Sequence, residues 1–299
     1  MVIAILTIPI TNALGGNQNA WIKYGFIMAL LVLLMLSICY MNGRKAKLVD
    51  EVSENDSQDE EEAIPLKKSI PMLFKNKYWV ILILFNLITQ ITNSIAATSG
   101  TYYCKWIFGN DNLVALAGAL GFFATLVGFV VSKPIIAKLG VRKTIDFGVL
   151  GAAFTALIRC IIPTNFKVYI AVSVIGSFVQ IPLMCLYGVL LAMVIDYNEY
   201  TYYNKMVGVS SGAIGIGTKI GSGVGSVILT ACLALGAYNP DLEVATTSMR
   251  YAIYAFSNYL PLIINLGLFV LFRFFDLEEK LPAIHEELAR RRSQKSTEQ

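Results

Sequence analysis

Long apolar stretches separated by short polar segments make up most of this chain. A helix that crosses a bilayer needs about 20 mostly apolar residues. Seven stretches satisfy that length, and they lie at residues 20–41, 78–103, 113–133, 143–162, 168–195, 206–237 and 249–273. An eighth apolar stretch, residues 1–14, is shorter. We interpret it as the end of a further helix rather than as a signal peptide, because no basic segment precedes it. The pattern predicts an all-α integral membrane protein with seven full transmembrane helices and a partial one.

One polar segment, residues 42–77, is much longer than the others. Its centre, DEVSENDSQDEEE at residues 50–62, holds eight carboxylates and no basic residue. A run of like charges repels itself and buries no core, so we expect a solvated linker. The chain then divides into the end of an N-terminal helix bundle (1–41), the acidic linker (42–77), a six-helix bundle (78–273) and a polar tail (274–299).

The composition agrees with a membrane protein and argues against an enzyme. Charged residues make up 15% of the chain and mean hydropathy is +0.62, whereas soluble domains carry about 25% charged residues. His285 is the only histidine, and the five cysteines are scattered without a C-x-x-C pair. These features argue strongly against histidine-based zinc sites and a Ser-His-Asp triad. We therefore expect no metal site, no catalytic residue and no nucleic-acid partner.

Lysine and arginine residues are distributed unevenly around the predicted spans. With the linker placed in the cytoplasm, 18 of them lie in inside segments and 4 in outside segments. Cytoplasmic loops of membrane proteins carry such an excess of basic residues. The chain is therefore expected to be a multi-pass protein of the cell membrane, with the linker and the C-terminus in the cytoplasm.

No carboxylate lies near the middle of a predicted span. Asp146 lies at the start of the span 143–162, and Asp196 directly follows the span 168–195. A carrier that couples transport to Na⁺ or H⁺ normally needs a carboxylate within the membrane to bind the cation. If this chain belongs to such a carrier, we expect its cation site to lie outside these 299 residues.

A single lysine, Lys219, lies in the glycine-rich stretch GAIGIGTKIGSGVGSV at residues 212–227. At 1.5 Å per residue it lies ~20 Å along the predicted helix, close to the middle of the membrane. Gly215 and Ser222 share its face of the helix, and Thr218 lies beside it. The lysine either lines a wet cavity or forms a buried ion pair with another helix. We predict the cavity-lining role.

The glycines of this stretch indicate close helix packing rather than nucleotide binding. Gly217, Gly221 and Gly225 repeat every four residues, a pattern that lets two helix backbones approach each other. Lys219 is one residue out of register with the phosphate-loop pattern G-x-x-x-x-G-K-[ST], and no G-x-G-x-x-G follows in frame. We therefore expect no nucleotide cofactor.

Amide side chains follow one stripe of the helix predicted at 78–103. Asn86, Gln90 and Asn93 recur at intervals of four and three residues, which places them on one face of a helix. Amides both donate and accept hydrogen bonds, as a site for a polyhydroxylated ligand requires. Amides also join transmembrane helices to each other, so the sequence leaves both roles open.

Two polar loops on the inner side carry the remaining candidate residues. Arg142 lies in the loop 132–144, and Asp196, Glu199 and Lys205 lie in the loop 195–205. We expect the two acids to pair with Lys205 or with basic residues of the first loop, as contacts of a cytoplasmic gate. No histidine or activated nucleophile stands beside them, so we assign them no catalytic role.

Several motifs, in order along the chain, resemble those of the glycoside–pentoside–hexuronide:cation symporters, the melibiose-carrier-like branch of the major facilitator superfamily. IDYNEY at 195–200 resembles the family signature [VI]-D-Y-x-E, and Gly208 with Lys219 and IGSGVG is similar to the pattern G-x10-K-x-G-x-[AG]-[LV]-G of its helix eleven. LGGNQNAWIKYGFIMALL, LGAYNP and FRFFDLEEKLPAIHEELARRR resemble the family's entry into helix six, the outer end of helix eleven and the tail.

The resemblance implies a twelve-helix fold of two six-helix halves around a central cavity. On that fold this chain would correspond to about helices five to twelve, as a C-terminal fragment or a truncated product. The family's cation-binding carboxylates lie in helices one to four. Lys219 corresponds to the helix-eleven lysine that borders the sugar and cation sites. Met193 and Val207 stand where, or close to where, relatives often carry an acid, which weakens any inner salt-bridge network carried over from them.

These observations favour a secondary active transporter that moves a sugar or glycoside together with Na⁺ or H⁺ by alternating access. No other cofactor is expected. The alternative substrate is an anionic or amphipathic solute, such as a uronide or a lysolipid, because a fixed cation binds anions well. The third possibility is a membrane fragment that does not transport, or one that partners a separately encoded N-terminal half.

Overall fold

The computed structural model divides the chain into two compact units, Met1–Ala63 and Ile64–Gln299. Every regular element among the described residues is a helix, as the sequence predicts. The described residues are 7, 10–11, 13–15, 17–45, 65–242 and 244–297. Most of the short helix expected at 1–14, and the whole acidic run 50–62, lie outside them.

The first unit contains one long helix, α2 (Gln18–Lys45), which confirms the span predicted at 20–41. Asn17 caps its start, because the side-chain Oδ1 accepts a hydrogen bond from the Ala20 backbone N–H at 2.9 Å. Such a cap satisfies one of the N–H groups that every helix start leaves open. Most apolar side chains of α2 are exposed, as lipid-facing side chains are in a membrane-spanning helix.

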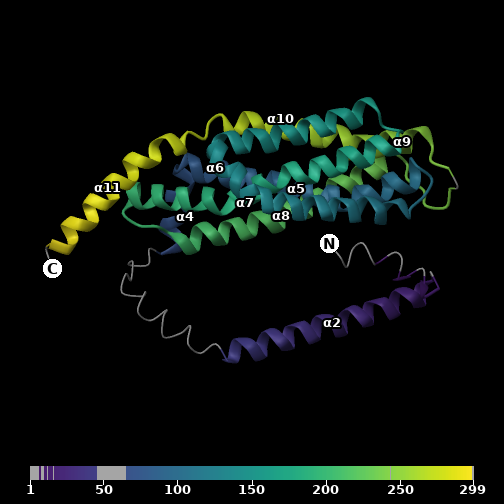
Figure 1. Ribbon diagram of the computed structural model, residues 1–299, viewed down its shortest axis with the longest axis horizontal. Coiled ribbons are helices and arrows are strands. Elements are labelled where there is room, and N and C mark those ends of the chain that lie inside the picture. Colours follow the sequence, from purple (N-terminus) through teal and green to yellow (C-terminus); the bar gives the residue numbers. More distant parts are fainter. Residues whose placement is uncertain are drawn as a thin grey trace. The chain divides into compact units, whose positions relative to one another are not determined.

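The second unit is a bundle of helices that run side by side (Figure 1). Its elements are α4 (Leu66–Lys75), α5 (Lys77–Trp106), α6 (Leu113–Ile161), α7 (Phe166–Tyr202), α8 (Val207–Leu235), α9 (Thr247–Tyr254), the π-helix η1 (Ala255–Tyr259), α10 (Leu260–Phe272) and α11 (Leu277–Thr297). The segments α5, α6, α7, α8 and the continuous run that begins with α9 are long and apolar enough to cross a membrane. Because α6 contains two spans, these segments account for all six spans predicted between 78 and 273.

The helix α6 reverses direction at Gly140, which has φ 74° and ψ 178°. Only glycine adopts this conformation readily, since a side chain would be strained at positive φ. A Cβ at Gly140 would also lie 3.1 Å from Oε1 of Glu278. The glycine therefore turns α6 into a hairpin of two arms, Leu113–Leu139 and Val141–Ile161, which correspond to the spans predicted at 113–133 and 143–162.

One end of the bundle gathers α4, the Gly140 turn, the connection from α7 to α8, and α11; we call it the tail end. The helix α4 lies in the stretch for which the sequence predicts a solvated linker. It is amphipathic: Leu73 and Ser69 are buried in the bundle, whereas Lys67 and Lys68 are exposed. The prediction missed this helix because its ten residues are too short to show a clear period beside the acidic run.

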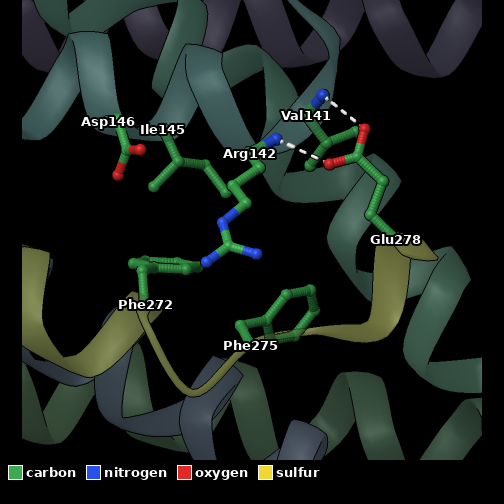
Figure 2. Close-up of a pocket in the computed structure, with 7 residues that line it drawn as sticks. All are labelled: Val141, Arg142, Ile145, Asp146, Phe272, Phe275 and Glu278. Carbon is green, nitrogen blue, oxygen red and sulfur yellow. Dashed lines mark hydrogen bonds between the residues drawn. The ribbon is translucent and has the colours of Figure 1, made fainter. Parts of the chain in front are cut away.

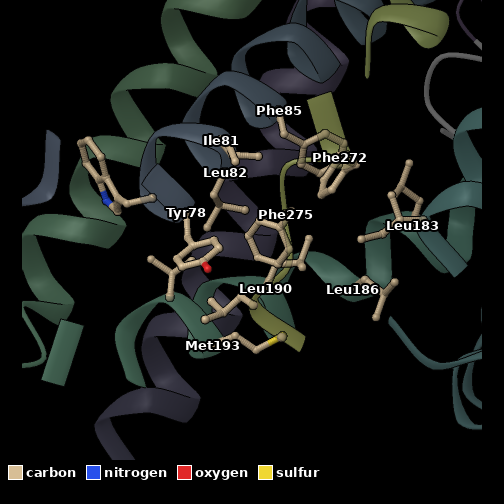
Figure 3. Close-up of a cluster of buried hydrophobic side chains, with 14 of the residues drawn as sticks. Tyr78, Ile81, Leu82, Phe85, Leu183, Leu186, Leu190, Met193, Phe272 and Phe275 are labelled. Carbon is tan, nitrogen blue, oxygen red and sulfur yellow. The ribbon is translucent and has the colours of Figure 1, made fainter. Parts of the chain in front are cut away.

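Two apolar clusters hold the second unit together, one toward each end. The cluster nearer the tail end joins α5, α7, the end of α10 and the start of α11, and Figure 3 shows its side chains converging around Tyr78 and Phe275. The rings of Tyr78 and Phe275 meet edge to face, with centroids 5.6 Å apart. The other cluster, at the far end, surrounds Tyr103, whose ring stacks on Tyr169 at 4.9 Å.

The helices α5 and α8 approach each other closely along a row of glycines. A Cβ at Gly221 would lie 2.6 Å from the carbonyl oxygen of Leu87, and one at Gly225 would lie 2.7 Å from the carbonyl oxygen of Ile91. Within a bilayer the apolar lipid removes the hydrophobic drive between helices, so close van der Waals contact must hold them together. The packing role predicted for Gly217, Gly221 and Gly225 is confirmed.

The glycine row predicts opposite effects for two neighbouring alanine substitutions. Gly221→Ala should lower the free energy of unfolding by about 1–3 kcal/mol, because the new methyl group overpacks the contact with α5. Gly223→Ala should raise it by about 0.5–1 kcal/mol, because Gly223 has open space around it and alanine favours a helix. Thermal unfolding in detergent measures both. Equal shifts of the same sign would contradict the close contact.

Candidate functional site

Lys219 lies on the face of α8 that points away from the contact with α5. It is 12 residues after the first residue of α8 and 16 before the last, so it lies ~18 Å from that start. Its side chain and the neighbouring Gly215 are exposed in the bundle, whereas Gly217 and Gly221 are buried. Neither α5 nor α8 contains an acid, and among the described residues no carboxylate pairs with Lys219. The structure therefore presents an uncompensated ammonium group at mid-helix.

Asn86 and Thr218 form a hydrogen-bonded link between α5 and α8 beside Lys219. The amide nitrogen of Asn86 donates to the carbonyl oxygen of Ile214 at 2.9 Å and to Oγ1 of Thr218 at 3.1 Å. Thr218 in turn donates to the Ile214 carbonyl at 3.0 Å. Asn86 is only 4% exposed. Its amide is thus used to join the two helices, which was one of the two roles that the sequence left open.

The other two amides of the stripe have different surroundings. Gln90 is half-buried and Asn93 is exposed. No hydrogen bond from either side chain to another described residue is formed. Ser222, on the facing part of α8, donates to the carbonyl oxygen of Thr218 at 3.0 Å. Gln90 and Asn93 therefore keep their donors and acceptors open among the described residues.

Arg159, the second charged residue within a span, lies in a polar cluster near the far end. Its guanidinium donates to Oγ of Ser173 at 2.9 Å and lies 5.0 Å from the centroid of the Tyr169 ring. Asn258, in the π-helix η1, donates to the Arg159 carbonyl oxygen at 3.3 Å and to the hydroxyl of Tyr103 at 3.2 Å. A cation–π contact and a position in the last turn of α6 both favour this cation.

A small pocket at the tail end lies between the α6 turn and the junction of α10 with α11 (Figure 2). Glu278 closes one side, and its two carboxylate oxygens accept hydrogen bonds from the backbone N–H groups of Val141 (2.9 Å) and Arg142 (2.8 Å). The Arg142 side chain reaches across the pocket toward Phe272 and Phe275. An acid at a helix start satisfies open N–H groups and opposes the positive end of the helix dipole.

The tail helix α11 supplies the partners of the predicted gate residues. Nε2 of His285 lies 2.8 Å from Oδ2 of Asp196, and Nη1 of Arg142 donates to Oε1 of Glu279 at 3.0 Å. The expected pairing of Asp196 with Lys205 or with the Arg142 loop is therefore wrong. These long-range partners depend on how the tail folds back, which hydropathy and helical period do not reveal.

Of the other two predicted gate residues, Glu199 lies in the last turn of α7 and Lys205 lies in the connection from α7 to α8. Both are half-buried at the tail end. The structure thus brings all four predicted gate residues to one end of the bundle, where α11 contacts α7.

Two polar groups at the tail end were missed by the sequence reasoning. Asn76 donates to Oδ1 of Asn198 at 2.8 Å, and Asn198 donates to Oγ of Ser210 at 3.5 Å. All three residues are buried, so they join the start of α5, the end of α7 and the start of α8. The motif IDYNEY contains Asn198, but the sequence drew attention to its acids instead.

Asp276, the second missed group, links the starts of α5 and α11. Its carboxylate forms ion pairs with Lys77 Nζ at 2.9 Å and with Lys280 Nζ at 2.6 Å. It also accepts a hydrogen bond from the Tyr78 hydroxyl at 2.8 Å. Asp276 follows the last span, and the hydrogen bonds from Lys280, Lys77 and Tyr78 hold the pKa of its carboxyl well below the usual range. This carboxylate therefore stays charged through the physiological pH range.

These features define a class of protein: a multi-pass helical membrane protein with charges concentrated at its ends and two cations within its spans. A family model described as MFS/sugar transport protein matches residues 1–279. The chain belongs to this family. This result confirms the membership of the major facilitator superfamily that the motifs indicate.

Curated relatives support the same family. The isoprimeverose transporter of Lactiplantibacillus pentosus is 26% identical over 248 residues, which cover 79% of this chain and 49% of the relative. The putative glycoside/cation symporter YagG of Escherichia coli is 19% identical over 300 residues, covering 98% and 63%. The inner membrane symporter YicJ of Escherichia coli is 21% identical over 296 residues, covering 97% and 62%. This chain spans about half to three fifths of the length of these relatives.

The pocket geometry predicts that Glu278 stabilises the second arm of α6 more than Glu279 does. Glu278→Ala leaves two N–H groups without their acceptor, which should destabilise the start of this arm by about 1–2 kcal/mol. Hydrogen exchange at Val141 and Arg142 should then become about tenfold faster. The matched variant Glu279→Ala removes only an exposed ion pair, worth about 0–1 kcal/mol. Equal exchange rates in the two variants would refute the capping role of Glu278.

Proposed function

We propose that this chain forms part of a secondary active transporter that moves a sugar or glycoside with Na⁺ or H⁺ by alternating access. The family and the names of the relatives support this function. The observation that carries it is the open face of α8. There Lys219 lies at mid-helix beside the exposed Gly215, and no carboxylate among the described residues pairs with it.

The open polar groups of α5 and α8 suit a polyhydroxylated ligand. Gln90 and Asn93 each offer an amide that both donates and accepts, and Lys219 offers a charged donor. Hydrogen bonds that involve a charged group are about twice as strong as neutral ones. Glycines such as Gly212 and Gly215 leave room for a ligand beside the helix, because nothing lies within 4 Å of their Cβ positions.

In this proposal Lys219 also responds to the coupling cation. A lysine in the middle of a span is expensive unless a carboxylate or water surrounds it. Its counter-charges would come from carboxylates outside the 299 residues of this chain. A cation bound to such carboxylates would release Lys219 to donate to the sugar, which links occupancy of the two sites.

The proposed orientation places the tail end in the cytoplasm. The excess of lysine and arginine at that end supports it. The contacts of α11 with Asp196, Arg142 and the α6 turn would then act as a cytoplasmic gate. Most of these ion pairs are exposed, so each is weak and can open and close within a transport cycle.

The role of Lys219 is tested by uptake of labelled neutral glycosides into cells that express this protein. Lys219→Ala should lower the initial rate of gradient-driven uptake about tenfold or more, because it removes a charged hydrogen bond. Lys167→Ala is the matched control, since it removes an exposed lysine at the far end of the bundle. Normal uptake by Lys219→Ala would exclude the cavity role. Wild-type uptake that persists after both the Na⁺ and the H⁺ gradient are dissipated would exclude symport.

An anionic glycoside is the second candidate substrate, and the uncompensated charge of Lys219 favours it. A glucuronide would place its carboxylate against the ammonium group, whereas a neutral galactoside has no carboxylate. Competition between unlabelled glucuronides and galactosides against a labelled neutral glycoside separates the two. Stronger inhibition by the glucuronide that disappears in Lys219→Gln would assign the anionic substrate.

A further inference from the structure

The basic residues of the tail end fall into two groups. One group is paired with acids: Lys77 and Lys280 with Asp276, Arg142 with Glu279, Arg273 with Asp146, His285 with Asp196, and Arg290 and Arg291 with Glu287. The other group includes Lys133, Lys138 and Lys143, which surround the Gly140 turn of α6. All three are exposed, and no described carboxylate pairs with them.

Within the part of the chain that the structure describes, the surroundings of this turn offer no spare acid. Residues 112–145 contain no aspartate or glutamate. The nearest carboxylates are already engaged, since Glu278 accepts the N–H groups of Val141 and Arg142, and Asp146 faces Arg273 at 3.8 Å. The three lysines therefore form a positively charged patch, which we call the hairpin patch.

Each arm of the hairpin carries an exposed apolar stripe that leads to this patch. The stripe of the second arm consists of Phe147, Leu150, Phe154, Leu157 and Ile161. These residues follow Lys143 at alternating steps of four and three, which keeps them on one face of a helix. From Lys143 to Ile161 the stripe extends ~27 Å, close to the ~30 Å thickness of the hydrocarbon core of a bilayer.

The first arm repeats the arrangement in the opposite direction. Its stripe consists of Leu116, Leu120, Phe123, Val127 and Val130, and it ends at Lys133. Val130 is the most exposed of them, at 78%. In both arms, therefore, an apolar surface about as long as the bilayer core ends in an exposed ammonium group within seven residues of Gly140.

We propose that the hairpin patch binds the headgroup of an anionic phospholipid. The phosphate would lie among Lys133, Lys138 and Lys143, and the acyl chains would lie along the stripes of the two arms. Flexible lysine side chains extend toward the interface while their methylene groups stay on apolar surface. Clusters of lysine and arginine beside a membrane attract anionic lipids. A zwitterionic lipid lacks the net charge to compensate the three ammonium groups.

The proposal is tested by counting lipids that remain bound to the full chain in native mass spectrometry. The protein is presented with phosphatidylglycerol or with phosphatidylcholine of the same acyl chains in mixed micelles. The wild type should retain phosphatidylglycerol preferentially. In the variant K133Q/K138Q/K143Q, the ratio of retained phosphatidylglycerol to retained phosphatidylcholine should fall about tenfold. Circular dichroism and gel filtration confirm that each variant is folded.

Two matched variants separate the patch from charge in general. K67Q/K68Q/K75Q removes three exposed lysines from α4, also at the tail end, and should retain the lipid preference. K133R/K138R/K143R keeps the charge and should retain it too. An equal loss of preference in both glutamine variants would overturn the proposal, and so would a wild type that binds the two lipids equally.

Two further measurements distinguish the lipid from other anions. Glycerol 1-phosphate, added as a soluble headgroup, should not displace the retained lipid at equal concentration, because it lacks the acyl chains that contact the stripes. Displacement would assign the patch to small phosphates and overturn the proposal. If the lipid is retained only after residues 50–62 are deleted, the hairpin patch binds that acidic segment rather than a lipid, and the proposal is overturned. Because the readout is lipid retention, a negative result here leaves the proposed transport function untouched.

Discussion

The close contact between α5 and α8 determines what the rest of the bundle can present. Gly221 and Gly225 bring the two backbones together, so α8 turns one face inward and leaves the opposite face open. Lys219 and Gly215 lie on that open face. If larger residues separated the helices, the hydrogen bonds of Asn86 to Ile214 and Thr218 would be lost as well. A packing requirement of the membrane thus places a charge on the exposed face of α8.

The ion pairs of α11 and the polar cluster at the far end of the bundle differ in burial. At the tail end α11 makes exposed ion pairs with α6 and α7, and such pairs are individually weak. At the far end Arg159, Asn258 and the stacked rings of Tyr103 and Tyr169 form a more buried cluster. Buried hydrogen bonds and stacked rings are harder to break than exposed ion pairs. The ion pairs of α11 are therefore weaker than the contacts of this cluster.

The helical spans and the glycine contact could be predicted from the sequence because each depends on local pattern. A run of about 20 apolar residues crosses a bilayer whatever its neighbours are, and glycines at every fourth position permit a close approach. The amide stripe shows the limit of this reasoning. Asn86, Gln90 and Asn93 have the same chemistry and one periodicity, yet the structure uses Asn86 to bind α8 and leaves Gln90 and Asn93 open.

By itself the sequence determined the class of protein, the spans, the lone lysine in α8 and the polar residues beside it. Only the tertiary structure decided which residues pair across long distances: Glu278 with the start of the second α6 arm, His285 with Asp196, and Asn76 with Asn198. Hydropathy and period describe neighbours within one helix. Partners that lie 89 or more residues apart meet only when the helices pack, and that packing depends on side-chain shape along every contact.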